Sequence, residues 1–137
     1  MKIIVVGHGM VGHKFLEELH QLASVPTEVT VLCEEPRAAY DRVHLSEFFA
    51  GKTADDLSLV ELGFFDYSGF SLRLKTPAAA IDRRKKTVTT ADGEVLSYDK
   101  LVLATGSTPF VPPVKGNDRA DCFVYRTIED LEAMTEC

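Results

Sequence analysis

Residues 2–12 read KIIVVGHGMVG, a short apolar run that ends directly in a glycine-rich turn. The β-branched residues of the run are typical of a buried parallel strand. Residues 10–23 predict an amphipathic helix, because four apolar residues recur at helical spacing. These four are Val11, Phe15, Leu19 and Leu22. Residues 28–33, EVTVLC, predict a second strand, so the chain begins with a βαβ unit, whose crossover is right-handed.

The turn between the first strand and the helix contains a GxGxxG motif, formed by Gly7, Gly9 and Gly12. In a dinucleotide-binding fingerprint, the first glycine allows the tight turn, the second lets the backbone approach a pyrophosphate, and the third lets the helix pack on the strand. The free N–H groups of Met10 and Val11 would supply hydrogen-bond donors to the phosphates. A glycine-rich turn in an unrelated α/β fold is the alternative, and the flanking strand, helix and acid disfavour it.

An acid follows the second strand, about 20 residues after the glycines, as the fingerprint requires. It is Glu34 or Glu35, and either residue could also be an ordinary solvated glutamate. A carboxylate at this place accepts hydrogen bonds from the two ribose hydroxyls of an adenosine. It would repel a 2′-phosphate, so NADP is disfavoured at this site.

A second motif lies in residues 98–107, YDKLVLATGS. It matches the second signature of flavoproteins that bind two dinucleotides, in which a strand ends in Ala-Thr-Gly. Such a strand brings Ala104 and Thr105 next to the flavin end of the crevice, and Gly106 lets the chain turn away.

The rest of the chain predicts smaller elements. Residues 43–70 suggest two short helices, around VHLSEFF and around LSLVELGFF. Residues 77–97 fit an antiparallel β-meander with a hairpin turn at residues 91–93, Ala-Asp-Gly. FAD domains of this kind insert such a meander into the Rossmann unit and NAD domains lack it, so FAD is favoured over NAD. Near the C-terminus, Thr127 and Asp130 predict a helix with a shortened capping box.

Composition narrows the classes of partner and compartment. The 137 residues are 45% hydrophobic and 26% charged, which suits one soluble globular domain. The net charge of −6 argues against nucleic acid or an acidic membrane as partner. No apolar run approaches the roughly 20 residues of a transmembrane helix, and the N-terminal run is too short for a signal peptide. A cytoplasmic protein is expected.

The sequence predicts neither a catalytic side chain nor a metal site. The histidines do not repeat a ligand spacing, and no CxxC pair is present. The residues considered are His8, His13, His20, His44, Cys33, Cys122 and Cys137. His8 falls at a variable position of the glycine motif, where its side chain is expected to point away from a pyrophosphate. Cys33 is expected to be a small buried hydrophobe.

Residues 34–46, EEPRAAYDRVHLS, resemble the FAD domain of rubredoxin- and ferredoxin-reductase-like flavoproteins, which are pyridine nucleotide-disulfide oxidoreductases. In that family an acid binds the ribose, and an arginine of a YDR-type turn reaches the FAD phosphates or the adenine. The resemblance therefore implies Glu34 as the ribose ligand, with Glu35 as its neighbour, and Arg42 as the anion partner.

The same resemblance bears on two further positions. It implies that Ala78, three residues before an Ile-Asp pair, gives its backbone to the adenine. A lysine that approaches the flavin often follows the LS of this segment in the family. Glu47 stands there instead, so a basic contact to the flavin is absent or comes from elsewhere.

Over essentially all 137 residues the chain resembles the N-terminal region of NAD(P)H-dependent nitrite reductase large subunits. The segments VVGHGMVGHKFLEEL, LCEEPRAAYDRVHLSEFF, YDKLVLATGSTPFVPPVKG and DCFVYRTIEDLEAM carry this resemblance. It implies an oxidoreductase of nitrate assimilation that passes electrons from NAD(P)H via FAD toward an iron–sulfur cluster and sirohaem. The sites for the last two, and for NAD(P)H, are expected outside this chain.

The expected fold is an α/β Rossmann-type parallel sheet with an antiparallel β-meander, as in an incomplete FAD domain. Residues 1–137 would be the N-terminal part of that domain, and residues 127–137 would begin the helix leading toward an absent NAD(P)H-binding domain. The expected partners are FAD, the remaining domains or subunit of the reductase, and further copies of the chain. Two alternatives are an FAD-dependent electron-transfer reductase of rubredoxin or ferredoxin type, and a non-catalytic nucleotide-binding or assembly fragment.

Overall fold

The computed structural model describes residues 1–136, and Cys137 lies outside the described residues. The chain forms two compact units. The first unit contains Met1–Tyr40 and Leu59–Gly106, and the second contains Asp41–Ser58 and the chain from Ser107 onward. Each unit is described by itself.

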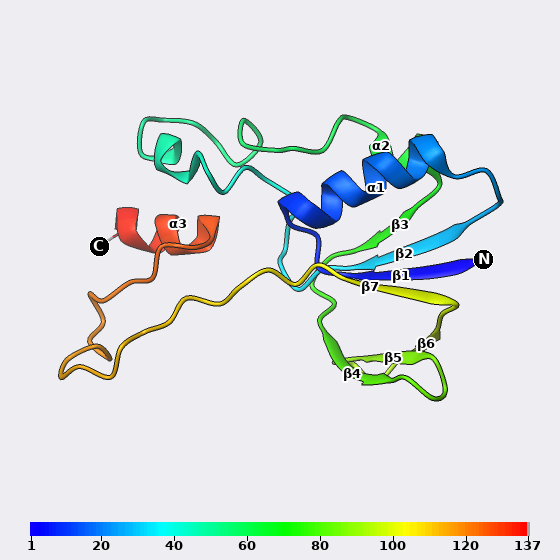
Figure 1. Cartoon of the computed structure of the whole chain (residues 1–137). Coiled ribbons are helices and arrows are strands. Elements are labelled where there is room, and N and C mark those ends of the chain that lie inside the picture. The colour runs from blue at the N-terminus through cyan, green and yellow to red at the C-terminus, as the bar shows by residue number, and fades with distance from the viewer. Residues whose placement is uncertain (137) are drawn as a thin grey trace. The chain divides into compact units, whose positions relative to one another are not determined.

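A parallel sheet is the centre of the first unit (Figure 1). Its strands are β1 (Lys2–Val6), β2 (Glu28–Leu32), β3 (Ser71–Arg73) and β7 (Lys100–Leu103). They lie in the order β3-β2-β1-β7, and each neighbouring pair is parallel. The βαβ unit predicted from the sequence is confirmed, and β7 places the second motif beside the first strand. Rossmann-type topology follows from this order.

A second sheet is inserted between β3 and β7. It contains β4 (Ala78–Asp82), β5 (Thr87–Thr90) and β6 (Val95–Ser97), paired antiparallel in chain order. The predicted meander and its hairpin turn are confirmed, since the N–H of Gly93 donates to the carbonyl of Thr90 at 3.0 Å and Gly93 has φ +91°. Only a residue that tolerates a left-handed backbone fits this turn easily.

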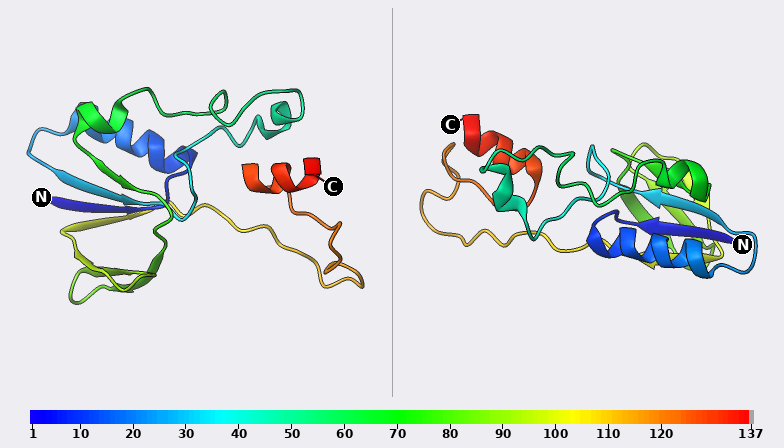
Figure 2. Two further views of the ribbon diagram at one scale, coloured as in Figure 1. Left: turned by 180° about the vertical axis from the view of Figure 1, so that it is seen from behind. Right: turned by 90° about the horizontal axis from the view of Figure 1, so that it is seen from above.

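Two helices, α1 (Met10–Leu22) and α2 (Phe64–Ser68), lie on one side of the parallel sheet, and the meander lies on the other (Figure 2). The alternating side chains of β1 explain both layers. Ile3 and Val5 pack in one core cluster with Leu16 and Phe64, while Ile4 packs in the other with residues of β2 and the meander. Burying such side chains stabilises the fold by about 1.5–3 kcal/mol each.

The buried face of α1 agrees with the predicted one in part, since Phe15 and Leu19 pack against the core cluster. Val11 and Leu22 are 74% and 75% exposed, whereas Leu16 is completely buried. The buried positions of the helix include His13, which is not one of the four apolar residues of the prediction. The ring of His13 takes a core position. The helix face that meets the sheet is therefore rotated relative to the face predicted from the four apolar residues.

The predicted helix around residues 57–65 is also displaced. The backbone of Leu57 and Leu59 forms hydrogen bonds with residues 39–41 instead of helical ones. The N–H of Asp41 donates to the carbonyl of Leu57 at 2.8 Å, and the N–H of Leu59 donates to the carbonyl of Ala39 at 3.0 Å. Helix α2 therefore begins only after Gly63, whose φ of +80° marks the turn. The other short helix is a 3₁₀ turn, η1 (Leu45–Phe48).

The second unit contains η1 and α3 (Ile128–Glu136). The predicted capping box of α3 is confirmed. The N–H of Thr127 donates to Oδ2 of Asp130 at 2.8 Å, and the N–H of Asp130 donates to Oγ1 of Thr127 at 3.2 Å. Each bond satisfies a backbone donor that the helix itself leaves unpaired.

None of the helices within residues 1–136 has the length and apolar character needed to cross a membrane.

Candidate dinucleotide-binding site

The glycine turn and the end of β7 are in direct contact. Gly7 has φ +100°, and a Cβ atom at this position would lie 2.3 Å from the carbonyl oxygen of Ala104. A Cβ at Gly12 would lie 2.5 Å from the carbonyl oxygen of Gly7 and 3.5 Å from Cβ of Ala104. Both glycines are therefore required by close backbone approach, which agrees with the tight turn predicted at Gly7 and with the helix–strand packing predicted at Gly12. The two sequence motifs meet at this point.

Gly9 has a different environment. No heavy atom of the described residues outside its immediate neighbours lies within 4 Å of a Cβ built there. Gly9 is the N-cap of α1 and offers no side-chain cap, and the first turn of the helix carries no acidic residue. The first N–H groups of α1, at Met10 and Val11, have no carbonyl within the helix to accept them. This helix end is thus open and positive, as an anion site requires.

The two glutamates after β2 have different surroundings. Glu35 accepts a hydrogen bond from the hydroxyl of Tyr40 at 2.8 Å, and its backbone carbonyl accepts one from Lys75 at 3.1 Å. Glu34 is exposed, and none of the hydrogen bonds or ion pairs among residues 1–136 involves its carboxylate. A carboxylate already bonded to a tyrosine has less capacity for a ligand, so Glu34 is the better candidate for ribose.

The remaining predicted residues of the first unit lie at strand ends. Ala78 is the first residue of β4, opposite Thr90, and packs against the core cluster that contains Ile4. The segment that leads to Ala78 is bound to the loop that follows β2 and carries Glu34 and Glu35, here called the acid-bearing loop (residues 33–39). The N–H of Thr76 donates to the carbonyl of Cys33 in this loop at 2.8 Å. The backbone of Ala78 is thereby held near that loop.

Ala104 continues the ladder one residue past β7, because its N–H donates to the carbonyl of Val6 at 2.8 Å. Thr105 and Gly106 follow as exposed residues, and Gly106 has φ +69°. The strand therefore ends with an exposed hydroxyl and a left-handed glycine at which the chain turns. This geometry agrees with the turn that the Ala-Thr-Gly pattern predicted.

Arg42 belongs to the second unit. Its Nη1 donates to the carbonyl oxygen of Arg126 at 2.8 Å, in the residue before the capping box of α3. The half-buried guanidinium therefore has a structural role within this unit that the sequence did not predict.

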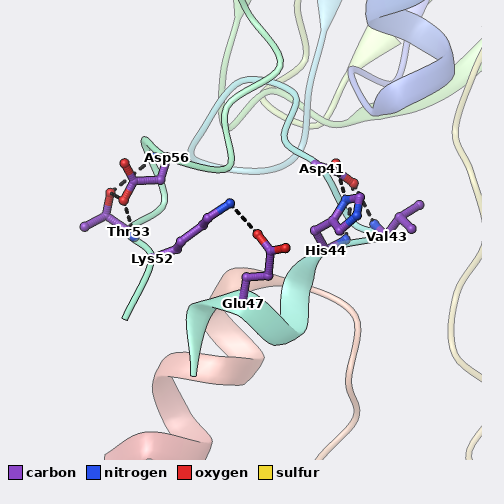
Figure 3. Close-up of polar contacts among 7 residues, drawn as sticks. All are labelled: Asp41, Val43, His44, Glu47, Lys52, Thr53 and Asp56. Atoms are coloured by element: carbon purple, nitrogen blue, oxygen red, sulfur yellow. Dashed lines mark hydrogen bonds and ion pairs between the residues drawn. The ribbon is translucent and has the colours of Figure 1, made fainter. Parts of the chain in front are cut away.

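Polar contacts organise the segment after Arg42 (Figure 3). Oδ2 of Asp41 lies 2.6 Å from Nδ1 of His44, while Oδ1 accepts the N–H of Val43 at 2.9 Å. The hydrogen bond to Asp41 raises the pKa of His44 above its ordinary value, and the same bond lowers the pKa of Asp41. Glu47, at the position of the expected lysine, forms an ion pair with Lys52.

A buried pair of histidines was missed by the sequence analysis. Nδ1 of His8 accepts a hydrogen bond from the N–H of Ala39 at 3.1 Å, and Nε2 of His8 lies 3.4 Å from Nδ1 of His13. Burial, with a smaller contribution from the charge of His13, lowers the pKa of His8 to about 4. The available signal was the placement of His13 three residues before Leu16, on one helical face.

No three histidine, cysteine, aspartate or glutamate side chains within residues 1–136 gather as metal ligands. Cys33 is buried and Cys122 exposed, and both are free thiols. Burial raises the pKa of the Cys33 thiol, so this group is protonated and unreactive at neutral pH.

Comparison with known proteins places this chain among pyridine nucleotide-dependent oxidoreductases. The family described as pyridine nucleotide-disulphide oxidoreductase matches residues 1–136. The chain is 48% identical over 138 aligned residues to the NADH nitrite reductase large subunit of Escherichia coli (strain K12). This alignment covers 100% of the chain and 16% of that protein.

The chain is also 54% identical over 135 aligned residues to the NAD(P)H nitrite reductase large subunit of Klebsiella oxytoca, covering 95% of the chain and 14% of that protein. Among solved structures, the NADH:rubredoxin oxidoreductase of Clostridium acetobutylicum superposes with a TM-score of 0.85 at 27% identity. That match covers 99% of the chain and 35% of the other. The chain thus spans less than a fifth of the length of these two nitrite reductase relatives.

Proposed function

The chain belongs to the pyridine nucleotide-disulphide oxidoreductase family, and we propose that it is the FAD-binding part of a nitrite reductase. It is homologous to the N-terminal region of the NADH nitrite reductase large subunit. The reduction of nitrite and the supply of electrons by NAD(P)H are proposed for the longer protein to which such a region belongs.

The observation that carries the choice of FAD is the antiparallel sheet β4-β5-β6, inserted between β3 and β7. In the flavoproteins that the chain resembles, the N-terminal FAD domain has such an insertion. The contact of the glycine turn with Ala104 adds support, because it joins the phosphate-binding motif to the strand end proposed for the flavin. The open space at Gly9 and the exposed carboxylate of Glu34 fit a dinucleotide.

The proposed pyrophosphate contacts use the backbone of the glycine turn and of the first turn of α1. The backbone at Gly7, Gly9 and Gly12 would let the pyrophosphate approach, and the N–H groups of Met10 and Val11 would donate to it. Oxygen atoms of a phosphate are strong acceptors, and the helix dipole favours their charge.

The nucleoside and flavin ends would be held by other residues. Glu34 would accept hydrogen bonds from the ribose hydroxyls, with Glu35 fixed beside it by Tyr40. The backbone of Ala78 would contact the adenine, and Ala104, Thr105 and Gly106 would line the flavin side. Arg42 is proposed, from the resemblance of its segment, as the partner of the phosphates or the adenine, because its planar fork pairs two oxygens.

When bound, FAD would supply a group that accepts a hydride from NAD(P)H and passes electrons on singly. The residues of this chain would bind and orient that group, and none of them is proposed as an acid or base. In the longer protein an iron–sulfur cluster and sirohaem would receive the electrons, at sites outside this chain. The second candidate is an electron-transfer reductase of rubredoxin type. Its support is the likeness of the chain to the solved NADH:rubredoxin oxidoreductase, at 27% identity. Assaying the longer protein with nitrite and with rubredoxin as acceptors separates the two.

Self-association is also proposed, because β7 is an edge strand of the parallel sheet and Leu103 is 61% exposed. Unpaired edges with apolar side chains favour association with a further chain. Light scattering at micromolar concentration tests this, and a clean monomer would contradict it.

The test of the proposed function is a titration of the purified chain with FAD, followed by flavin fluorescence and by the visible spectrum. Parallel titrations with NAD and with ADP serve as ligand controls. Glu34→Ala and Arg42→Ala are the variants. Saturable FAD binding that both substitutions weaken would support the proposal. Equal affinity for NAD and FAD, or unchanged binding in both variants, would contradict it.

A further inference from the structure

His8 joins the glycine turn to the acid-bearing loop. It follows Gly7 directly, is only 5% exposed, and accepts the backbone N–H of Ala39 at Nδ1. Ala39 is 1% exposed and lies at the far end of the loop that leaves β2 and carries Glu34. One imidazole ring therefore connects the proposed phosphate site to the proposed ribose site.

The hydrogen bonds determine the tautomer of both rings. A ring nitrogen that accepts a hydrogen bond carries no proton, so the proton of neutral His8 is on Nε2. That nitrogen lies 3.4 Å from Nδ1 of His13, which must then be the acceptor. The proton of His13 is consequently on Nε2, which lies 3.7 Å from Oε1 of Glu17. The chain of donors thus runs in one direction, from Ala39 through His8 to His13.

Aromatic packing holds the two rings in place. His8 contacts Phe65 edge-on with the ring centroids 5.4 Å apart, and His13 contacts Phe64 edge-on at 5.1 Å. The carbonyl of Ala39 is itself bonded to the N–H of Leu59 at 3.0 Å. Both backbone polar groups of Ala39, at the end of the acid-bearing loop, are therefore hydrogen-bonded. His8 accepts one of these two bonds.

We propose that His8 is a positioning residue, whose Nδ1 holds the acid-bearing loop at the distance from the glycine turn that one nucleotide requires. The consequence for the cofactor rests on the proposed function, because Glu34 is the proposed ribose ligand. A binding site is effective only when its groups are held within about 0.5 Å of the required geometry, so release of Ala39 would weaken binding without removing any ligand.

Three substitutions at one position separate the hydrogen bond from the packing. His8→Phe keeps a ring and removes the acceptor, which leaves the buried N–H of Ala39 unpaired. His8→Asn places an amide near the position of Nδ1, and His8→Gln extends its amide toward that of Nε2. His20→Phe is the control, because His20 lies on α1, the helix that carries His13, and like His13 it contacts Phe64 edge-on.

Two measurements are made on the full chain. Amide hydrogen exchange of Ala39, by NMR without ligand, reports the bond itself, and an FAD titration reports its effect on binding. We expect His8→Phe to lose the protection of Ala39 and to raise the Kd for FAD about tenfold. His8→Asn should restore most of the protection of Ala39 and most of the FAD affinity, whereas His8→Gln should restore neither. His20→Phe should match the wild type in both measurements.

Unchanged protection of Ala39 in His8→Phe, or equal behaviour of His8→Asn and His8→Gln, would overturn the inference. If His8→Phe failed to fold, the comparison of Asn with Gln would still decide it. If the wild type bound no FAD, the proposed function would fail, and the exchange of Ala39 alone would show whether His8 holds the loop.

Discussion

The backbone of Gly7 lies so close to Ala104 that a Cβ on the glycine would be 2.3 Å from the alanine carbonyl oxygen. The neighbouring atoms are backbone, at the ladder position where the N–H of Ala104 bonds to Val6. Neither partner can therefore move without disturbing the sheet. The glycine turn and the end of β7 form one rigid junction, although nearly the whole unit separates them in sequence.

We expect Gly7→Ala to destabilise the chain strongly, by about 2–5 kcal/mol. The substitution combines a left-handed φ of +100° with a clash against backbone atoms. Urea unfolding followed by circular dichroism measures the free energy of unfolding of the variant against the wild type. A variant within about 0.5 kcal/mol of the wild type would contradict the close approach.

Gly9→Ala gives the complementary prediction. Its φ of −96° suits any residue, and a Cβ there meets no heavy atom within 4 Å. Stability should therefore stay within about 1 kcal/mol of the wild type. The added methyl group would occupy the space through which the phosphates approach, so FAD affinity should fall about tenfold or more. Unchanged affinity would place the phosphates elsewhere.

The two glutamates after β2 should separate into a ligand-binding and a structural residue. Glu34→Gln should leave stability unchanged within about 0.5 kcal/mol and weaken FAD binding about tenfold. Glu35→Gln should instead cost about 1 kcal/mol of stability, because the bond from Tyr40 is lost or weakened. Tyr40→Phe should reproduce that cost. Weakened binding in Glu35→Gln alone would reverse the assignment.

The sequence predicted the elements whose local chemistry agrees with the fold. The β-branched run at Lys2–Val6, the glycine motif and the hairpin at Gly93 all formed as expected, because strand propensity and turn geometry are local properties. The same holds for the capping box of Thr127 and Asp130, which needs only residues within one turn.

The features that could not be predicted depend on long-range contacts. His13 counts as polar by residue type, and its long-range contacts with His8 and Phe64 make it a core residue of α1. The segment at Leu57 and Leu59 has a helical pattern, but long-range hydrogen bonds take its backbone. The bond from Arg42 to Arg126 likewise joins residues far apart in the sequence. A pattern of residue types carries no information about such partners.

Acid should destabilise the first unit through His8. Its pKa falls from the ordinary 6.5 to about 4 because of burial and, less, because of His13. The folded value lies below the unfolded value, so between these pH values the unfolded chain binds more protons. The stability that neutral His8 contributes is thus fully present above pH 6.5. It is lost as the pH falls from 6.5 to about 4, by about 3 kcal/mol in total. His13, whose pKa is also lowered by burial, acts in the same direction, while Glu17 opposes it.

Urea unfolding of the wild type and of His8→Asn, at about pH 7 and about pH 5, measures this contribution, because asparagine does not titrate. Between the two pH values the wild type should lose about 2 kcal/mol more than the variant. His44→Asn is the control, since the pKa of His44 is raised by Asp41 and its contribution is therefore present at low pH and lost as the pH rises. Because His44 opposes the effect of His8, that variant should lose at least as much stability as the wild type between the two pH values. Equal losses in the wild type and His8→Asn would show that the ring of His8 is not held neutral by the fold.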